Sequence, residues 1–154
     1  MKLSELLREG QILTGFRAKD RWETIGLLAE LLASQGRLAP EQRAPVLDAL
    51  LAREKIASTG LEHGVALPHA PVEILEETLA VLAVSPEGIP FQSADGQPAR
   101  IVALLAFPRR RTHEHSALLA STARLLSYED TREALLRVHS PREALQAVRD
   151  AERA

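Results

Sequence analysis

Apolar positions follow two patterns along this chain: they recur at helical spacing in some segments and form uninterrupted runs in others. From Asp20 to Gly36 they recur every three or four residues, as on the core face of a helix. That predicted face carries Trp22, Ile25, Leu28, Ala29 and Leu32. Asp20 and Glu23 have the spacing of a helix-capping box, so we expect the helix to begin there.

A second helix is predicted from about Pro40, where proline suits the first helical turn. Pro45 then either bends this helix or marks its true start, because proline cannot donate a main-chain hydrogen bond. Its apolar positions are Val46, Leu47, Leu50 and Leu51.

Two uninterrupted apolar runs, at 78–85 and 101–107, are too uniformly apolar for half-exposed strands, so we predict central strands. Gly88, Pro90 and Asp95-Gly96 between them indicate an irregular connection with a short hairpin near Phe91. A shorter strand is predicted over 65–67.

The ends of the chain complete the pattern. Residues 3–14 predict a short helix or turn followed by a small strand at Ile12 and Leu13. Thr112 is expected to cap a helix whose buried stripe is Leu118, Leu119, Thr122, Leu125 and Leu126. Asp130 with Glu133, and Ser140 with Glu143, are expected to cap two further helices.

The element order predicts a single α/β domain over 1–154, a small mixed β-sheet with helices on both faces.

Composition narrows the class of protein. The 154 residues are 45% hydrophobic and 26% charged, which is ordinary for one globular domain. No apolar run approaches the ~18 residues of a membrane span, and the N-terminus has no signal-peptide core. We therefore expect a cytoplasmic protein without membrane insertion.

Several kinds of chemistry are excluded or disfavoured. Cysteine is absent, which excludes disulfides, thiolate catalysis and cysteine-based zinc sites. The net charge of −2 gives no bias toward nucleic acid, and the arginine run at 109–111 lacks interleaved aromatic residues. Five histidines leave a metal site open, but His113 and His115 diverge on a helix and no H-E-x-x-H pattern exists. We expect no metal.

The stretch 58–70 is the strongest candidate for chemistry. Gly60 and Gly64 permit a loop, a short strand follows, and Pro68 fixes the backbone immediately before His69. His69 is thus expected at a strand end with its imidazole aimed in one direction, either for catalysis or as a purely structural histidine. Arg53 lies in the last turn of its helix, where it either serves a site or only compensates the helix dipole.

A family resemblance rests on these residues. The run Leu50-Leu51-Ala52-Arg53-Glu54-Lys55, with Ser58-Thr59-Gly60 and Gly64-Val65-Ala66-Leu67-Pro68-His69, resembles the signature of mannitol/fructose-type enzyme IIA domains of the bacterial phosphotransferase system. The resemblance extends over nearly the whole chain. Glu62-His63 departs from it, because relatives often carry Gly-Asn or similar there.

The resemblance implies roles for individual residues. His69 would be the phosphoryl acceptor, with Arg53 as its guanidinium neighbour and His115 as a second histidine beside it. The hydroxyls of Ser58 and Thr59 would add donors to the phosphoryl oxygens. His115 falls on the buried stripe near a helix N-terminus, so its alternative is a partly buried histidine without a chemical role.

Partners follow from the same resemblance. The donor would be the phosphohistidine of an HPr-like phosphocarrier protein, and no cofactor is implied. Two destinations remain open for the phosphoryl group: a regulatory role of the nitrogen type, or an enzyme IIB in a fructose- or mannitol-type permease, with this chain as a stand-alone protein in either case. A binding module that keeps the fold without phosphorylation is a third alternative.

Arg109, Arg110 and Arg111 would form part of the rim that a phosphorylated partner meets, unless they lie in a solvated loop.

Overall fold

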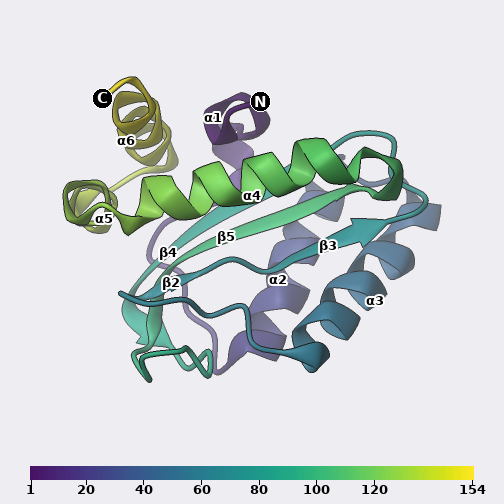
Figure 1. The fold of residues 1–154 in the computed structure, drawn as a ribbon, viewed down its shortest axis with the longest axis horizontal. Helices are drawn as coiled ribbons and strands as arrows, with labels where there is room; N and C mark the ends of the chain where they lie inside the picture. Colours follow the sequence, from purple (N-terminus) through teal and green to yellow (C-terminus); the bar gives the residue numbers. More distant parts are fainter.

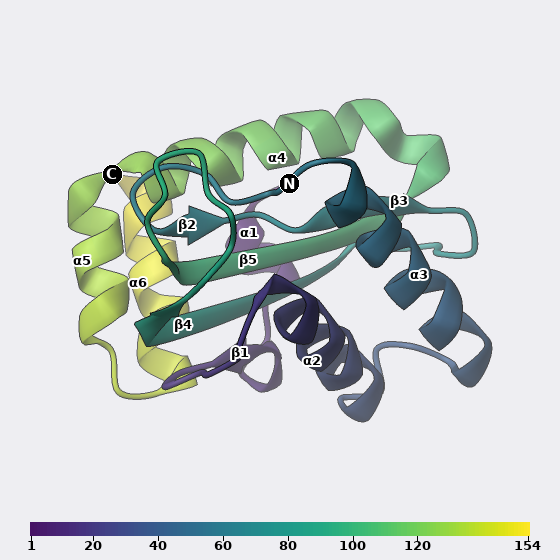
Figure 2. The same ribbon diagram turned by 90° about the horizontal axis from the view of Figure 1, so that it is seen from below.

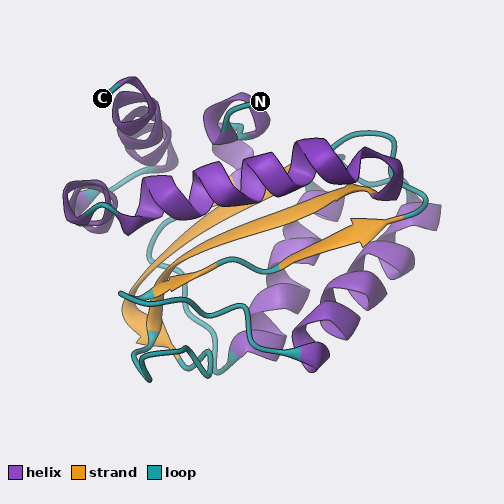
Figure 3. Ribbon diagram, viewed as in Figure 1, coloured by secondary structure: helices purple, strands orange, loops and turns teal.

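The computed structural model describes residues 1–154 and shows a five-stranded mixed sheet with helices on both faces (Figures 1 and 3). The predicted fold class is confirmed. The helices are α1 (Leu3–Leu6), α2 (Arg21–Ser34), α3 (Pro40–Ile56), α4 (Thr112–Ser127), α5 (Glu129–Arg137) and α6 (Pro141–Arg153), with 3₁₀ turns η1 (Glu9–Gln11) and η2 (Arg109–Arg111). The strands are β1 (Ile12–Leu13), β2 (Val65–Ala66), β3 (His69–Val72), β4 (Leu79–Ile89) and β5 (Ala99–Pro108).

The centre of the sheet is the antiparallel pair β4 and β5, which carries the two long apolar runs. β1 pairs in parallel with β4 at one edge, while β2 and β3 both pair in parallel with β5 at the other. The register from β2 to β3 is continuous, because Ala66 pairs with Val102 and His69 with Leu105. β2 and β3 therefore follow one line that Leu67 and Pro68 interrupt.

Each face of the sheet carries its own core, because successive side chains of a strand point to opposite faces. Val102, Leu104 and Ala106 of β5 pack with α2 and α3. Ile101, Ala103 and Leu105 pack with α1, α4, α5 and α6. Figure 2 shows α2 and α3 on one side of β4 and β5, and α4 on the other. Both faces of β5 are buried, as its uniformly apolar sequence predicts.

Several local predictions need correction. Trp22 is 36% exposed rather than in the core, and the Arg21 guanidinium lies 4.6 Å from its ring centre. Thr112 does not cap α4, because its hydroxyl donates to the Arg109 carbonyl instead. Asp130 lies inside α5 and Tyr128 precedes that helix, so the Asp130 cap is wrong. The caps at Asp20 and Ser140 are confirmed by side chains that accept the main-chain N–H three residues on.

The predicted positions near the site also shift slightly. α3 begins at Pro40, and Pro45 lies inside the helix rather than at its start. His69 opens strand β3 instead of closing the strand before it. Phe91 forms no separate hairpin; it is buried in the connection between β4 and β5, packed in the core under α2 and α3. No helix has the length and apolarity needed to cross a membrane.

Candidate functional site

His69 is the first residue of the edge strand β3. Figure 1 shows this strand between α3 on one face of the sheet and α4 on the other. Its partner on β5 is Leu105, whose side chain belongs to the core under α4. Residues in register share a face, so the His69 imidazole lies on the α4 face. An edge strand has no neighbour on its outer side, which leaves this half-buried ring accessible from outside.

The orientation of His69 is set by one main-chain contact. Its Nδ1 atom lies 2.7 Å from the carbonyl oxygen of Leu67. A carbonyl only accepts, so Nδ1 carries the proton and Nε2 keeps its lone pair. Pro68 stands between the two residues, and its own carbonyl accepts from the Leu105 N–H at 2.9 Å. The ring is thus held on a segment that is fixed at both ends.

The electrostatic surroundings of His69 favour a neutral ring. Burial lowers the pKa of His69 below the ordinary value of 6.5. The hydrogen bond to the Leu67 carbonyl raises this pKa, the positive charge of Arg53 lowers it, and the negative charge of Glu54 raises it. A neutral imidazole with a free Nε2 is the form that acts as a nucleophile.

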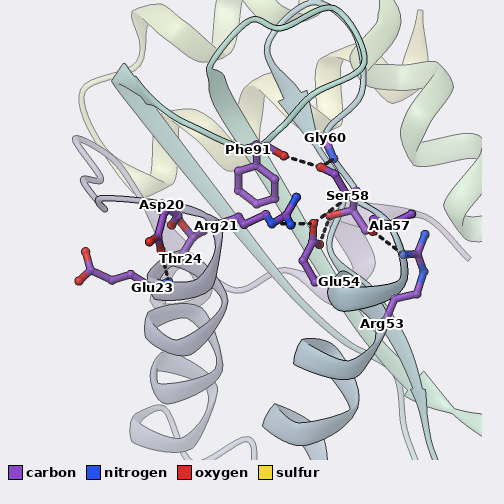
Figure 4. A network of polar contacts seen from close by, with 11 residues as sticks. Asp20, Arg21, Glu23, Thr24, Arg53, Glu54, Ala57, Ser58, Gly60 and Phe91 are labelled. Carbon is purple, nitrogen blue, oxygen red and sulfur yellow. Dashed lines mark hydrogen bonds and ion pairs between the residues drawn. The ribbon is translucent and has the colours of Figure 1, made fainter.

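Arg53 reaches this region from α3. It lies in the last helical turn, as predicted, and its Nη1 donates to the Ala57 carbonyl at 2.8 Å. In Figure 4 the Arg53 side chain points toward Ala57 and away from Glu54. The other guanidinium nitrogens make no hydrogen bond to protein, so four of its five N–H donors are free to meet an anion.

His115 is buried on α4, only 1% exposed, as the helical stripe predicts. Its ring centre lies 4.2 Å from that of Phe107, and its Nε2 lies 3.3 Å from the Thr78 hydroxyl. Its Nδ1 is buried without any partner. Burial is the main cause that lowers the pKa of His115; the negative charge of Glu114 raises this pKa, and the positive charge of Arg111 lowers it by less. An imidazole nitrogen without a partner in a protein interior is unusual, because buried polar groups are nearly always hydrogen-bonded.

The structure brings His69 and His115 to the same face of the same sheet edge. Phe107, which packs on His115, pairs with Pro71 of β3, two residues after His69. His113, in contrast, is exposed on α4. The predicted divergence of the two neighbouring histidines is confirmed.

Glu54 is a site neighbour that sequence reasoning missed. It is 1% exposed and accepts two hydrogen bonds from Thr59, from the main-chain N–H at 2.9 Å and from the hydroxyl at 2.5 Å. The Nε of Arg21, from α2, lies 3.8 Å from the same carboxylate (Figure 4). A glutamate beside an arginine at a helix end gives no sequence signal of burial, because glutamate is usually exposed.

The hydroxyls of Ser58 and Thr59 are both engaged within the protein. Ser58 donates to the Phe91 carbonyl and accepts from the Gly60 N–H at 3.0 Å (Figure 4). Thr59 donates to Glu54. Each hydroxyl has one proton, so neither is free to donate to a phosphoryl oxygen in this arrangement. They instead join the loop after α3 to α3 itself and to the β4–β5 connection.

Glycine is required at Gly60 by close packing. A Cβ there would lie 2.5 Å from the Ser93 hydroxyl oxygen and 3.0 Å from the Ser93 Cα.

The residues Glu62-His63, which depart from the family pattern, are accommodated locally. His63 adopts a left-handed backbone with φ of 63°, and its N–H donates to Asp95 at 2.9 Å. This hydrogen bond lowers the pKa of the exposed Asp95.

The three consecutive arginines point to three different surroundings. Arg109 pairs with Glu73 at 3.3 Å, and both side chains are largely exposed. Arg110 donates to the Leu75 carbonyl at 3.4 Å, and Arg111 lines a cavity with Arg8 and Arg37. Arg111 is the one whose charge acts on His115. No cluster of three or more histidine, aspartate or glutamate side chains is placed to hold a metal ion.

Comparison with known proteins now identifies the family. The model of the family "Phosphoenolpyruvate-dependent sugar phosphotransferase system, EIIA 2" matches residues 5–151. This chain belongs to that enzyme IIA family. The resemblance that the motifs around Arg53 and His69 carry is therefore confirmed for almost the full chain.

Relatives from both branches of the family are similar in sequence. A fructose-specific EIIA component from Haloferax volcanii is 35% identical over 116 residues, covering 75% of this chain and 74% of the relative. A nitrogen regulatory protein from Bradyrhizobium diazoefficiens is 33% identical over 130 residues, covering 84% and 83%. Sequence identity alone thus favours neither branch of this enzyme IIA family.

Solved structures agree with the fold. The nitrogen regulatory protein IIA-Ntr from Neisseria meningitidis superposes with a TM-score of 0.86 at 28% identity, covering 95% of this chain and 98% of that one. The mannitol enzyme IIA from Escherichia coli, solved in complex with its phosphorylated enzyme IIB, superposes with a TM-score of 0.78 at 26% identity, covering 94% and 97%.

Proposed function

We propose that this enzyme IIA-type protein is a phosphocarrier that accepts a phosphoryl group on Nε2 of His69. The observation that supports this most is the contact between Nδ1 of His69 and the Leu67 carbonyl, which leaves Nε2 as the nucleophile. The family and the lowered pKa of His69 agree with this role.

In the proposed step, the Nε2 lone pair of neutral His69 attacks the phosphorus of a phosphohistidine on an HPr-like donor protein. The donor N–P bond breaks, its electron pair returns to the donor imidazole, and a new N–P bond forms on His69. The proton on Nδ1 stays in its hydrogen bond to the Leu67 carbonyl. Such a transfer needs positioning and charge stabilisation rather than covalent help.

Arg53 and His115 are proposed to stabilise the transferred group. Arg53 has free N–H donors for the equatorial oxygens, and a guanidinium offers them as a planar fork. His115 contributes its unpartnered Nδ1 when that atom carries a proton, with Nε2 accepting from the Thr78 hydroxyl. Ser58 and Thr59 support the site through the loop, and would have to leave their present acceptors to bind phosphate directly.

The downstream partner is proposed to be a regulatory target, as for the nitrogen-type relatives. The high structural similarity to the IIA-Ntr protein supports this choice. An enzyme IIB of a fructose- or mannitol-type permease is the second candidate, supported by the complex of the mannitol relative with phosphorylated enzyme IIB. Incubating the phosphorylated protein with the purified IIB of a neighbouring permease operon would separate them, because phosphoryl transfer to IIB supports only the second.

Arg109, Arg110 and Arg111 are proposed as part of the rim that the phosphorylated donor approaches. They lead directly into α4, which carries His115, and exposed charges accelerate encounter over a Debye length of ~8 Å at physiological salt. Reversing all three to glutamate should slow transfer from the donor at low salt and lose most of this effect at high salt. Equal second-order rates for the variant and the wild type at every salt concentration would assign these residues to a solvated loop.

The central test uses the variant His69→Ala. The purified variant is incubated with a phosphorylated HPr-like donor, and its intact mass is measured beside that of the wild type and of His113→Ala. We expect one phosphoryl group on the wild type and on His113→Ala, and none on folded His69→Ala. A phosphorylated His69→Ala protein would refute the assignment, and an unlabelled wild type would favour the binding-module alternative.

A further inference from the structure

A cavity of about 310 Å³ is lined in part by Thr78, whose hydroxyl also lies 3.3 Å from Nε2 of His115. Four segments that are distant in sequence form it: the region around α1, the turn between α2 and α3, the end of the β3–β4 connection, and η2. Its charged and polar wall consists of Glu5, Arg8, Arg37, Glu77, Thr78 and Arg111. Only two of its eight lining residues are hydrophobic.

The wall carries more positive than negative charge. Arg37 pairs with Glu77 at 3.2 Å, and Glu5 accepts a weak hydrogen bond from the main-chain N–H of Lys2 at 3.4 Å. Arg8 and Arg111 form no ion pair. Three guanidinium groups therefore face two carboxylates, and two of the three are free to bind an anion.

Two buried polar groups at this cavity also lack complete partners. The Arg37 side chain is only 17% exposed, and its Nε is buried without an acceptor. Thr78 is 6% exposed, and its hydroxyl meets only the His115 ring at 3.3 Å. Buried donors are usually satisfied, so a cavity with an unsatisfied Arg37 Nε–H and excess positive charge is suited to an acceptor-rich ligand.

We infer that this cavity binds a small phosphate-bearing anion, held by Arg8 and Arg111 and by the hydroxyl of Thr78. A phosphate group has several acceptor oxygens and up to two negative charges, which matches two guanidinium forks and one hydroxyl donor. The cavity volume lies at the small end of the range for ligand sites, so inorganic phosphate or a small phosphorylated metabolite fits it better than a larger ligand.

Binding in this cavity has a direct route to His115. The Thr78 hydroxyl has one proton. If this proton is donated in a hydrogen bond to the anion, the hydroxyl oxygen can act only as an acceptor toward His115. Nε2 of His115 must then carry the ring proton. A neutral ring protonated at Nε2 has no proton on Nδ1, which removes the donor proposed for the phosphoryl group. The anion is thus an inhibitor of transfer to His69, and this effect, unlike binding itself, rests on the proposed function.

Binding is tested by NMR titration of the ¹⁵N-labelled protein with inorganic phosphate at constant ionic strength. We expect saturable shifts at the amides of Thr78 and Arg111. In Arg8→Gln the affinity should fall about tenfold, because a charge-assisted contact is lost. Arg43→Gln, which removes an exposed arginine without an ion pair from α3, is the matched control and should bind as the wild type does. Equal affinities in the two variants, or no saturable shift in the wild type, would overturn the inference.

A second titration with citrate identifies the anion class. Phosphate binding that exceeds citrate binding supports the phosphate assignment, whereas a preference for citrate would overturn it in favour of carboxylates. The ring ¹⁵N shifts of His115 should report the Nε2-protonated form when phosphate is bound.

The inhibitory effect is tested separately from binding. Saturating phosphate should slow phosphorylation of His69 about tenfold or more in the wild type. In Arg8→Gln the same slowing should need about tenfold more phosphate, and the rate of this variant without added phosphate should equal that of the wild type. Saturable binding with unchanged transfer in the wild type would overturn the inhibition. A wild type that never becomes phosphorylated would refute the proposed function, while the cavity would still be judged by the titration.

Discussion

The Nδ1 atom of His69 and the carbonyl oxygen of Leu67 form a 2.7 Å hydrogen bond between two residues only two positions apart. Pro68 lies between them and restricts the backbone that both share. The contact therefore fixes the ring tautomer without help from a distant side chain. Its chemical consequence is that Nδ1 is occupied by its proton and Nε2 keeps a lone pair.

The first prediction is that phosphate attaches to Nε2 of His69 and not to Nδ1. A phosphoryl group on Nδ1 would replace the proton that this atom donates to the Leu67 carbonyl, and the hydrogen bond would be lost. Two-dimensional ¹⁵N NMR of the phosphorylated ring distinguishes the two isomers. A signal from the Nδ1-phosphorylated isomer would show that the ring turns during transfer and would remove the Leu67 contact from the mechanism.

The second prediction concerns Arg53. Loss of one charge-assisted contact in such a site costs ~2 to 4 kcal/mol of barrier, so Arg53→Ala should transfer roughly a hundredfold slower or worse. Arg53→Lys should recover only part of the rate, because an ammonium cannot reproduce a planar fork. Rapid-quench kinetics with the phosphorylated donor measure this, with the exposed Arg43→Ala of the same helix as control. Unchanged kinetics in Arg53→Ala would remove this residue from the site.

The third prediction concerns His115→Ala. The variant should also transfer roughly a hundredfold slower, since it loses the proposed donor to the phosphoryl oxygens. It should still become phosphorylated on prolonged incubation, because His69 remains the acceptor. His115→Asn, which keeps a side-chain donor, should be faster than His115→Ala. The assignment fails if His115→Ala transfers at the wild-type rate.

The fourth prediction is that Glu54 holds the site loop in place. Glu54→Ala leaves the Thr59 N–H and hydroxyl without their acceptor and Arg21 without its partner. We expect the free energy of unfolding to fall by about 2 to 3 kcal/mol in urea denaturation. Glu41→Ala, an exposed glutamate at the start of the same helix, should change it by less than about 0.5 kcal/mol. Similar losses in both variants would contradict a special role for Glu54.

The fifth prediction is a pH dependence of stability. Burial lowers the folded-state pKa of His69 and His115 below 6.5, so the unfolded chain binds protons more readily than the folded one. The contribution of these two histidines to the free energy of unfolding should therefore be greatest above pH 6.5. It should fall as the pH decreases through and below that value. His115→Gln should flatten this fall, whereas the exposed His113→Gln should not. Equal slopes for the two variants would show that His115 titrates normally.

The sequence determined the local features of this protein by itself. The helical spacing of its apolar residues predicted α2, α3 and α4, and two uninterrupted apolar runs predicted the central strands, because both patterns depend on neighbours along the chain. The motif around Arg53 and His69 was enough to indicate the enzyme IIA family. Local rules failed at Trp22, which lies under the Arg21 guanidinium, and at Thr112, whose hydroxyl donates to the Arg109 carbonyl. They also failed at Asp130, because α5 begins one residue earlier.

Only the tertiary structure decided which groups meet. Burial of Glu54 depends on Arg21 from α2 and Thr59 from the following loop, and the contact of His115 with Thr78 joins residues 37 positions apart. The three arginines before α4 are adjacent in sequence, yet each has a different neighbour once the chain folds. Such contacts arise from sheet register and helix packing, which bring together side chains whose pairing leaves no periodic trace in the sequence.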